Sequence, residues 1–294
     1  MMTKRTATAA DWIEAARPKT LPASAAPVLM GVGYAWGIAG HPVVGRSLLA
    51  LLVALALQVG VNYANDYSDG IRGTDDEGAR QGPQRLTGPG LAAPRTVLTV
   101  ALGCFGVAAL AGLVLVAISG TWFFLIIGAL AIVAAWFYTG GRHPYGYIGG
   151  VAEVLVFVFF GLVATMGTIR TQVSALPGAA WAAAAGIGLL SCALLMVNNI
   201  RDIPGDREAG KMTLAARIGD TPARCVYIAY LLVAAALAVP TSIIVGIVAA
   251  VAGIALAVRL WQARTTPQLI GILRWTGYLT LAYGVAVGVA AVLR

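Results

Sequence analysis

Long uninterrupted apolar runs dominate this sequence and restrict what the chain can fold into. An α-helix needs about 20 apolar residues to cross the hydrocarbon core, and within lipid its backbone polar groups must be satisfied inside the segment. Only 11% of the residues are charged, against about 25% in soluble domains. Nine runs of roughly this length occur, near residues 21–40, 46–65, 96–118, 121–139, 147–168, 179–200, 223–239, 241–258 and 272–293. We therefore expect an all-α integral membrane domain over residues 1–294, with nine transmembrane helices.

Basic residues indicate the orientation of this predicted bundle. With a cytoplasmic N-terminus and nine spans, 17 of the 20 Lys and Arg residues fall in cytoplasmic segments, and only Arg46, Arg170 and Arg294 do not. An excess of Lys and Arg marks cytoplasmic loops. We expect residues 1–20 to form a cytoplasmic N-terminal segment. Orientation and attraction to anionic membrane lipid account for the net charge of +8 without nucleic acid as a partner.

The 12 acidic residues are concentrated after two of the predicted helices, one in each half of the chain. Five of them, from Asp66 to Glu77, follow the second run, and four, from Asp202 to Asp220, follow the sixth. Each cluster follows the second helix of a four-helix set. We expect two four-helix halves around a central cavity, with the ninth helix added. The cytoplasmic loops 66–95 and 201–222 would then converge.

Helical spacing places the key residues of each cluster on one face. Asn62, Asp66 and Asp69 are separated by four and three positions, so a helix would align them. Like charges at this spacing repel each other by a few tenths of a kcal/mol, roughly, so a compensating cation is expected.

The second cluster repeats this pattern with Asn198, Asp202 and Asp206, separated by four and four positions. Pro204 and Gly205 should break or kink the helix there. Mg²⁺ is the natural counter-ion, because it takes one or two carboxylates together with waters and phosphate oxygens. The basic side chains among the carboxylates suit a metal–diphosphate complex better than a metal alone; they are Arg72, Arg201, Arg207 and Lys211.

A solvated, salt-bridged loop is the ordinary explanation for one such cluster. Two clusters in matching positions, each beginning inside an apolar run, favour a functional site instead, because ionisable groups at membrane depth are functional candidates. The cysteines, Cys104, Cys192 and Cys225, have no metal-binding spacing and are expected to serve packing.

Asn65-Asp66-x-x-Asp69 and Asp202-x-x-x-Asp206, together with the predicted topology, resemble the UbiA superfamily of intramembrane prenyltransferases. Within it, the sequence is most similar to the branch that uses 1,4-dihydroxy-2-naphthoate in menaquinone synthesis. The similar segments are Arg17-Pro18-Lys19-Thr20-Leu21-Pro22, Asn62 to Asp75, Gly82-Pro83-x-Arg85, Tyr138-Thr139-Gly140-Gly141, Gly149-Gly150-x-x-Glu153 and Asn198 to Leu214. The sequence Gly140-Gly141-Arg142-His143-Pro144 departs from the 4-hydroxybenzoate branch.

The resemblance implies Mg²⁺-dependent transfer of a polyprenyl chain from polyprenyl diphosphate to 1,4-dihydroxy-2-naphthoate, with loss of CO₂ to give demethylmenaquinol. It assigns Asp66 and Asp69 to one Mg²⁺ and Asp202 and Asp206 to a second, as catalytic residues. The remaining residues of this part of the site are expected to assist the metals or hold diphosphate oxygens; they are Asn62, Asn65, Asn198, Arg72, Lys211 and Arg207.

The acceptor carboxylate needs a basic partner, and the sequence leaves four candidates open: Arg17, Lys19, Arg142 and Arg201. Glu153 is the single acidic residue within a predicted span, and Tyr138 lies near the same level. Each of these two could contact substrate or make an ordinary structural hydrogen bond. His41 and His143 are expected in loops.

Two alternatives remain open from the sequence. The acceptor could be 4-hydroxybenzoate, homogentisate, or a lipid or sugar phosphate. The chain could also be a membrane transporter, which would favour carboxylates at the midplane over carboxylates at helix ends. The strong bias toward Arg over Lys is typical of a high-GC bacterium, so we expect a multi-pass protein of the bacterial plasma membrane with a cytoplasmic active site.

Overall fold

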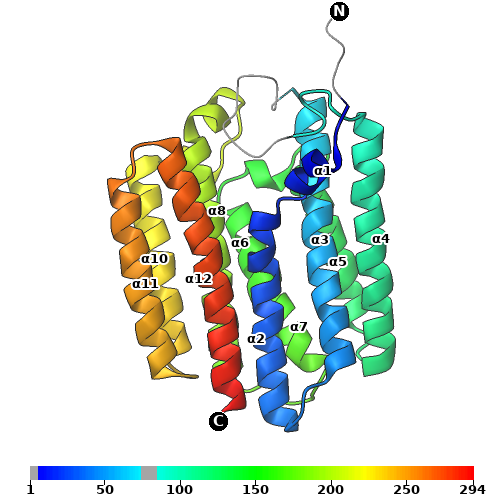
Figure 1. Ribbon diagram of the computed structural model, residues 1–294, viewed down its shortest axis with the longest axis vertical. Coiled ribbons are helices and arrows are strands. Elements are labelled where there is room, and N and C mark those ends of the chain that lie inside the picture. The colour runs from blue at the N-terminus through cyan, green and yellow to red at the C-terminus, as the bar shows by residue number, and fades with distance from the viewer. Residues whose placement is uncertain (1–5, 74–84) are drawn as a thin grey trace, which may run out of the picture.

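The computed structural model describes residues 6–73 and 85–294 (Figure 1). Within these residues the chain forms helices and their connections, and an isolated parallel bridge joins Ile148 to Met212. Several residues singled out in the sequence, Asp75, Asp76, Glu77, Gly82 and Pro83, lie outside the described residues.

The helical elements follow the predicted apolar runs in order. In chain order they are α1 (Ala9–Ala15), η1 (Pro18–Thr20), α2 (Leu21–Ala39), α3 (Val44–Ile71), α4 (Pro94–Ser119), α5 (Phe124–Phe137), η2 (Tyr145–Tyr147), α6 (Val151–Val156), the π-helical η3 (Phe157–Val163), α7 (Ala164–Arg170), α8 (Gly178–Glu208), α9 (Leu214–Ile218), α10 (Asp220–Ala238), α11 (Ile243–Gln262) and α12 (Thr266–Val292). The elements α6, η3 and α7 are consecutive and make one continuous helical rod.

Eight helical segments among the described residues are long and apolar enough to cross a membrane. The remaining predicted span, 121–139, contains α5, which has 14 residues. At 1.5 Å per residue this helix is about 21 Å long, shorter than a bilayer core of about 30 Å. The multi-pass helical architecture is therefore confirmed, and the count of nine crossings stays a prediction.

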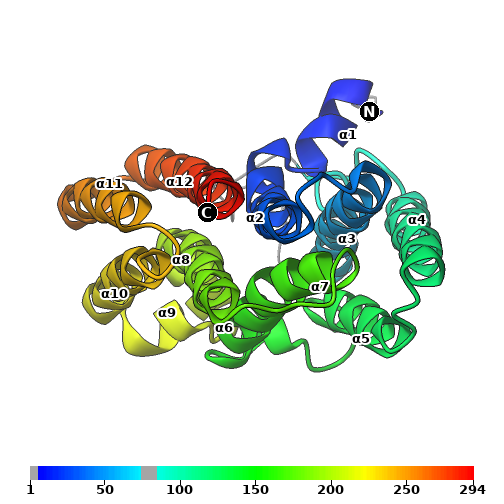
Figure 2. The ribbon, with the colours of Figure 1, turned by 90° about the horizontal axis from the view of Figure 1, so that it is seen from below.

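The long helices run side by side, with α1 and the C-terminal end of α12 at opposite ends of the bundle (Figure 1). Seen end-on, α2 to α5 lie to one side, α8, α10 and α11 to the other, and α6 and α7 lie between them (Figure 2). Helix α12 packs on α2, α8 and α11. Helix α12 therefore joins α2 to α8 and α11, and α2 also packs on α7. The division into two four-helix halves stays a prediction.

The helices that carry the two acidic motifs extend beyond the apolar runs. Asp66 and Asp69 belong to the last turns of α3, and Asp202 and Asp206 belong to α8. Of the break or kink expected at Pro204, the break is wrong, because α8 continues through this residue to Glu208; the kink stays a prediction. A proline in a helix removes one i→i−4 hydrogen bond, and that loss does not end a helix of 31 residues.

The contact between α2 and α12 depends on residues without bulky side chains. A Cβ atom added to Gly33 would lie 2.3 Å from the carbonyl oxygen of Gly288, and one added to Gly37 would lie 2.2 Å from that of Ala291. Small residues at such spacing let two membrane helices approach closely and gain packing contacts. This α2–α12 seam, formed by Gly33 and Gly37 against Gly288 and Ala291, holds the first long helix of the bundle against the last.

Arg46 is one of the three basic residues that the charge pattern placed outside the cytoplasm, and the structure gives it a role there. Its guanidinium donates to the carbonyl oxygens of Ile118 (2.8 Å) and Thr171 (3.0 Å). Both carbonyls lie at helix C-terminal ends, where they have no partner within their own helices. Arg46 therefore ties α3 to the ends of α4 and α7.

We expect Gly33→Ala to lower the free energy of unfolding by about 1–3 kcal/mol, because the added methyl group forces the α2 and α12 backbones apart. The matched control is Gly106→Ala in α4, where an added Cβ would have nothing within 4 Å. Thermal unfolding of the purified protein in detergent measures both variants. Equal midpoints for the two would contradict a tightly packed α2–α12 seam.

Candidate active site

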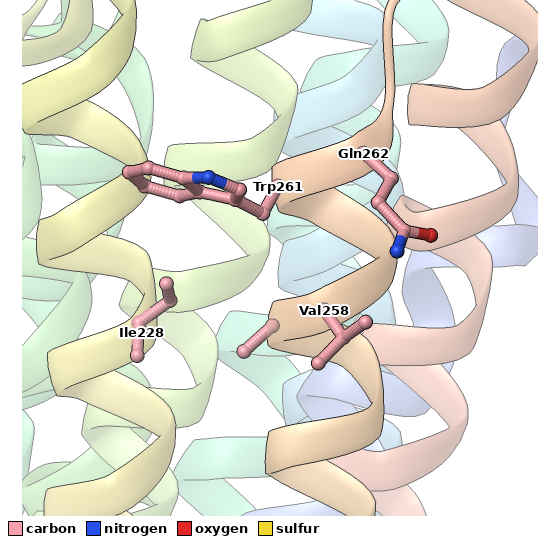
Figure 3. A pocket seen from close by; sticks show the side chains of 5 residues that line it. Ile228, Val258, Trp261 and Gln262 are labelled. Atoms are coloured by element: carbon pink, nitrogen blue, oxygen red, sulfur yellow. The ribbon is translucent and has the colours of Figure 1, made fainter.

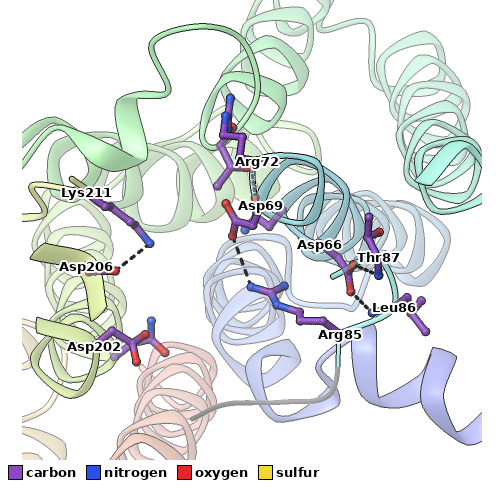
Figure 4. A network of polar contacts seen from close by, with 12 residues as sticks. Asp66, Asp69, Arg72, Arg85, Leu86, Thr87, Asp202, Asp206 and Lys211 are labelled. Atoms are coloured by element: carbon purple, nitrogen blue, oxygen red, sulfur yellow. Dashed lines mark hydrogen bonds and ion pairs between the residues drawn. The ribbon is translucent and has the colours of Figure 1, made fainter. Parts of the chain in front are cut away.

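Asp66 anchors the chain segment that returns to the end of α3. Its two carboxylate oxygens accept the backbone N–H groups of Leu86 (2.9 Å) and Thr87 (2.9 Å), and the residue is fully buried. The segment passes close to α3 at Gly70, where a Cβ atom would lie 2.5 Å from Thr87. Asp66 thus points toward Leu86 and Thr87, away from the other motif carboxylates (Figure 4).

Asp69 lies one turn further and faces the second motif (Figure 4). Its Oδ1 accepts a hydrogen bond from the hydroxyl of Tyr147 (3.0 Å), and its Oδ2 lies 3.5 Å from the guanidinium of Arg85. Both charged side chains of this ion pair are more than nine-tenths buried. Because Asp66 holds the backbone of residues 86–87, it also places Arg85 next to Asp69.

The second motif begins with a bidentate ion pair between neighbours. Arg201 donates from Nε and from one terminal nitrogen to the two oxygens of Asp202, each at 2.7 Å. The same terminal nitrogen donates to the amide oxygen of Asn198 (2.9 Å). Bidentate pairing of this kind is stronger and more directional than a single contact. Arg201 therefore aligns Asn198 and Asp202 on one face of α8, as their spacing predicted.

Asp206 pairs with the segment that follows α8. Its carboxylate lies 3.5 Å from Nζ of Lys211 and accepts the hydroxyl of Thr213 at 3.3 Å. Arg207 turns elsewhere and donates to the carbonyl oxygen of Ala216 (2.9 Å). This contact ties the end of α8 to α9, which is a structural role for Arg207. Its contact with a diphosphate stays a prediction.

Tyr147 lies between the two motifs. The guanidinium carbon of Arg72 lies 5.7 Å from its ring centroid, and Nζ of Lys211 lies 5.4 Å from it. Arg72 also donates to the carbonyl oxygens of Thr139 and Gly141. The two basic side chains expected to converge from opposite halves of the chain thus meet at one aromatic ring.

Of four other predicted site residues, two make structural contacts and two are exposed. The amide of Asn62 donates to the carbonyl oxygen of Ala16 (2.8 Å) and so holds the α1–α2 region against α3. Asn65 accepts the hydroxyl of Thr139 (2.6 Å). Lys19 and Arg142 are exposed. The substrate roles of these four residues stay predictions.

Glu153 and Tyr138 lie near the connection that leads into α6. One oxygen of Glu153 accepts the backbone N–H of Gly150 (2.9 Å), as a capping residue does, while Oε1 is buried without a hydrogen-bond partner in the described part of the chain. The ring of Tyr138 packs edge-on against Tyr145, with centroids 5.5 Å apart. The helix-end hydrogen bond of Glu153 is therefore present, and its substrate role stays a prediction.

Sequence reasoning did not place Arg85 and Tyr147 in the site. Arg85 belongs to the Gly82-Pro83-x-Arg85 segment, which resembles the 1,4-dihydroxy-2-naphthoate branch but carries no predicted role. Tyr147 follows Tyr145 in a short connection and belongs to no motif. Only the folding of the α5–α6 connection against residues 211–214 reveals its position.

The chemistry of the donors fits Mg²⁺, because Asp69, Asp202, Asp206 and the amide of Asn198 offer the hard oxygen ligands that this ion prefers. Among the described residues, however, no three carboxylate, His or Cys side chains are grouped as a ready-made metal site. Mg²⁺ commonly takes one or two protein carboxylates and completes its coordination with waters and substrate phosphates. The arrangement fits a metal that binds together with a phosphorylated substrate.

A groove of about 260 Å³ lies between α10 and α11, lined by Ile228, Ala257, Val258, Trp261 and Gln262 (Figure 3). Its walls are almost entirely apolar, and they include no residue of either motif. A second depression of about 270 Å³ lies between α11 and α12 and includes Arg259 and Trp275. The central cavity expected between the halves corresponds to neither, and it stays a prediction.

We expect Asp66→Ala to destabilise the fold as well as the site, because it leaves two buried N–H groups without acceptors at a cost of about 1–3 kcal/mol each. Asp66→Asn keeps one acceptor oxygen and should lose about half as much. Thermal unfolding midpoints of both variants in detergent test this. An Asp66→Ala variant as stable as the wild type would show that the carboxylate does not anchor residues 86–87.

Comparisons with known proteins show the family and the fold of this chain. Residues 24–272 match the UbiA prenyltransferase family. The 1,4-dihydroxy-2-naphthoate octaprenyltransferase of Mycobacterium tuberculosis is 48% identical over 284 residues, covering 95% of each chain, and that of Escherichia coli is 42% identical over 225 residues, covering 72% of this chain and 70% of its own. A UbiA homologue from Archaeoglobus fulgidus, solved bound to GPP and Mg²⁺, shares the fold with a TM-score of 0.69 at 13% identity, over 94% of this chain and 99% of that one. The chain is a prenyltransferase that belongs to the UbiA family.

Proposed function

We propose that this enzyme transfers a polyprenyl chain from polyprenyl diphosphate to 1,4-dihydroxy-2-naphthoate, with loss of CO₂, giving demethylmenaquinol. We further propose that it is Mg²⁺-dependent and crosses the bacterial plasma membrane nine times. The N-terminus and the active site would lie on the cytoplasmic side, where the positive-inside pattern puts them.

The observation that carries the reaction type is the meeting of the two acidic motifs with basic side chains at one end of the bundle. Asp69 of α3 and Lys211, which follows α8, both contact Tyr147. A site that must release a diphosphate anion needs this mixture of carboxylates and cations, because the cations bind phosphate oxygens and the carboxylates hold metal.

Different residues of this chain would have different roles in the donor site, which is the site that would bind polyprenyl diphosphate. Asp69, Asp202 and Asp206 would hold Mg²⁺ with help from Asn198, and the role of Asp66 at a metal is part of the same proposal. When bound, Mg²⁺ neutralises negative charge that develops on the diphosphate as the allylic C–O bond breaks. Lys211, Arg85 and Arg201 lie where they can hold diphosphate oxygens once a substrate competes for them. The apolar helices exclude water, which would otherwise trap the allylic cation.

The acceptor assignment rests on the relatives, whose names give 1,4-dihydroxy-2-naphthoate as their substrate, at 48% and 42% identity. This chain supplies the expected chemistry. Arg17, Lys19, Arg142 and Arg201 are the candidates to hold the acceptor carboxylate. Glu153 is the candidate to accept a proton from an acceptor hydroxyl, because its buried Oε1 has no partner among the described residues.

The proposal is tested by offering a labelled long-chain prenyl diphosphate to membranes that contain this chain, against a panel of aromatic acids with Mg²⁺ present. We expect a decarboxylated prenyl product from 1,4-dihydroxy-2-naphthoate, none in excess chelator, and recovery when Mg²⁺ is restored. A product from 4-hydroxybenzoate or homogentisate instead would overturn the acceptor. Turnover that is undiminished in chelator would overturn the metal-dependent mechanism.

Asp69→Ala, Asp202→Ala and Asp206→Ala should each reduce the rate of prenyl transfer at least about a hundredfold, as expected for loss of one electrostatic contact to developing charge. Asp220→Ala is the matched control. Its carboxylate pairs with Arg224, and its side chain is about half exposed, outside the motifs. Activity is measured at equal amounts of folded protein. If Asp220→Ala were as damaging as the motif variants, the loss would reflect general electrostatics of the bundle end.

A further inference from the structure

The α5–α6 connection places one aromatic side chain where it touches both halves of the proposed donor site. Gly146 donates its N–H to the carbonyl oxygen of Tyr138 (2.9 Å), and Gly149 donates to that of Met212 (2.9 Å). A Cβ atom on Gly146 would lie 2.4 Å from Tyr138, and one on Gly149 would lie 2.7 Å from Leu214. The two glycines thus let the connection lie against both the end of α5 and the segment after α8.

Tyr147 projects from this connection, and its side chain contacts charged groups from both motif regions. Its hydroxyl donates to Asp69, and its ring receives Arg72 and Lys211. Arg72 is itself fixed by the carbonyls of Thr139 and Gly141. A chain of contacts therefore runs from the end of α5 through Arg72 and the Tyr147 ring to Lys211 and on to Asp206.

An aromatic ring is suited to this place because its faces carry negative potential and attract cations. The cationic side chains of Arg72 and Lys211 repel each other, and the aromatic ring that both contact offsets part of this repulsion. Because the ring is uncharged, it does not compete with the carboxylates for a metal ion. A lysine ammonium on a flexible four-carbon stem otherwise samples many positions. The ring restricts Lys211 to the neighbourhood of Asp206 before a diphosphate arrives.

We propose that Tyr147 is a positioning residue of the donor site, an inference that rests on the proposed function. Its ring holds Lys211 in place to receive diphosphate oxygens, and its hydroxyl orients the carboxylate of Asp69. The ring of Tyr147 thereby contributes to diphosphate binding, and its hydroxyl contributes to the rate of prenyl transfer. Neither motif contains this residue, although it contacts side chains from both.

The test separates ring from hydroxyl in the full-length chain held in lipid nanodiscs. Binding of inorganic pyrophosphate with Mg²⁺ present is measured by calorimetry, and prenyl transfer gives kcat and KM for the prenyl diphosphate. Tyr147→Leu, which removes the ring, should weaken pyrophosphate binding about tenfold. Tyr147→Phe keeps the ring and should bind pyrophosphate within about threefold of wild type, while kcat falls about tenfold.

Two comparisons exclude a merely structural role. Tyr145→Phe is the matched control, because Tyr145 lies in the same η2 turn and its hydroxyl donates to the backbone of Ala134. This variant should retain both pyrophosphate affinity and kcat. In a double-mutant cycle, Lys211→Met with Tyr147→Leu should bind pyrophosphate no more weakly than Lys211→Met alone, because the ring acts through Lys211.

The proposal would be overturned if Tyr147→Leu bound pyrophosphate as tightly as the wild type, or if the losses of pyrophosphate affinity in the double-mutant cycle were additive. It would also be overturned if the wild-type chain did not bind pyrophosphate. If Tyr147→Leu does not fold, Tyr147→Phe decides, and unchanged kcat in that variant overturns the role of the hydroxyl. A wild-type chain that binds pyrophosphate but transfers no prenyl group would remove the proposed function, while the binding measurements would still judge Tyr147.

Discussion

Charge must be compensated where water is scarce, and this requirement organises the functional end of the molecule. An ionised carboxylate buried without a partner costs several kcal/mol, roughly, so buried charges are paired or bind metal. Asp69 pairs with Arg85, Asp202 with Arg201, and Asp206 with Lys211. Asp202 and Arg201 are neighbours within α8, whereas the other two pairs each join a helix end to the chain that follows it. Those two pairs therefore also position the following segments around the site.

Internal ion pairs of this kind can be exchanged for contacts with a bound metal–diphosphate. A diphosphate with Mg²⁺ offers the basic side chains an anion and offers the carboxylates a cation, so the internal pairs could be replaced without leaving any charge unpaired. Asp66 differs, because its partners are the backbone N–H groups of residues 86 and 87. Its contacts support the site by placing Arg85, whatever its role toward metal.

The sequence predicted those features that follow from local pattern. Apolar runs located the helices, and the spacing of Asn198, Asp202 and Asp206 predicted a shared face of α8, which the contacts of Arg201 with the first two confirm. The pattern also predicted a break or a kink at Pro204, and the break is wrong, because a proline near the end of a long helix need not end it. Tyr147 was missed because its role arises from the pairing of Ile148 with Met212, a contact between segments 64 positions apart that leaves no periodic signal.

We propose that carboxylates from both halves of the chain act on one diphosphate. An experimental structure of the protein with Mg²⁺ and an unreactive thiolo analogue of a prenyl diphosphate tests it most directly. We expect the carboxylates of Asp69 and of Asp202 or Asp206 to lie within about 10 Å of each other around a shared metal–diphosphate, given Mg–O distances of about 2.1 Å. A diphosphate held by one motif alone, with the other motif's carboxylates still in their internal ion pairs, would contradict it.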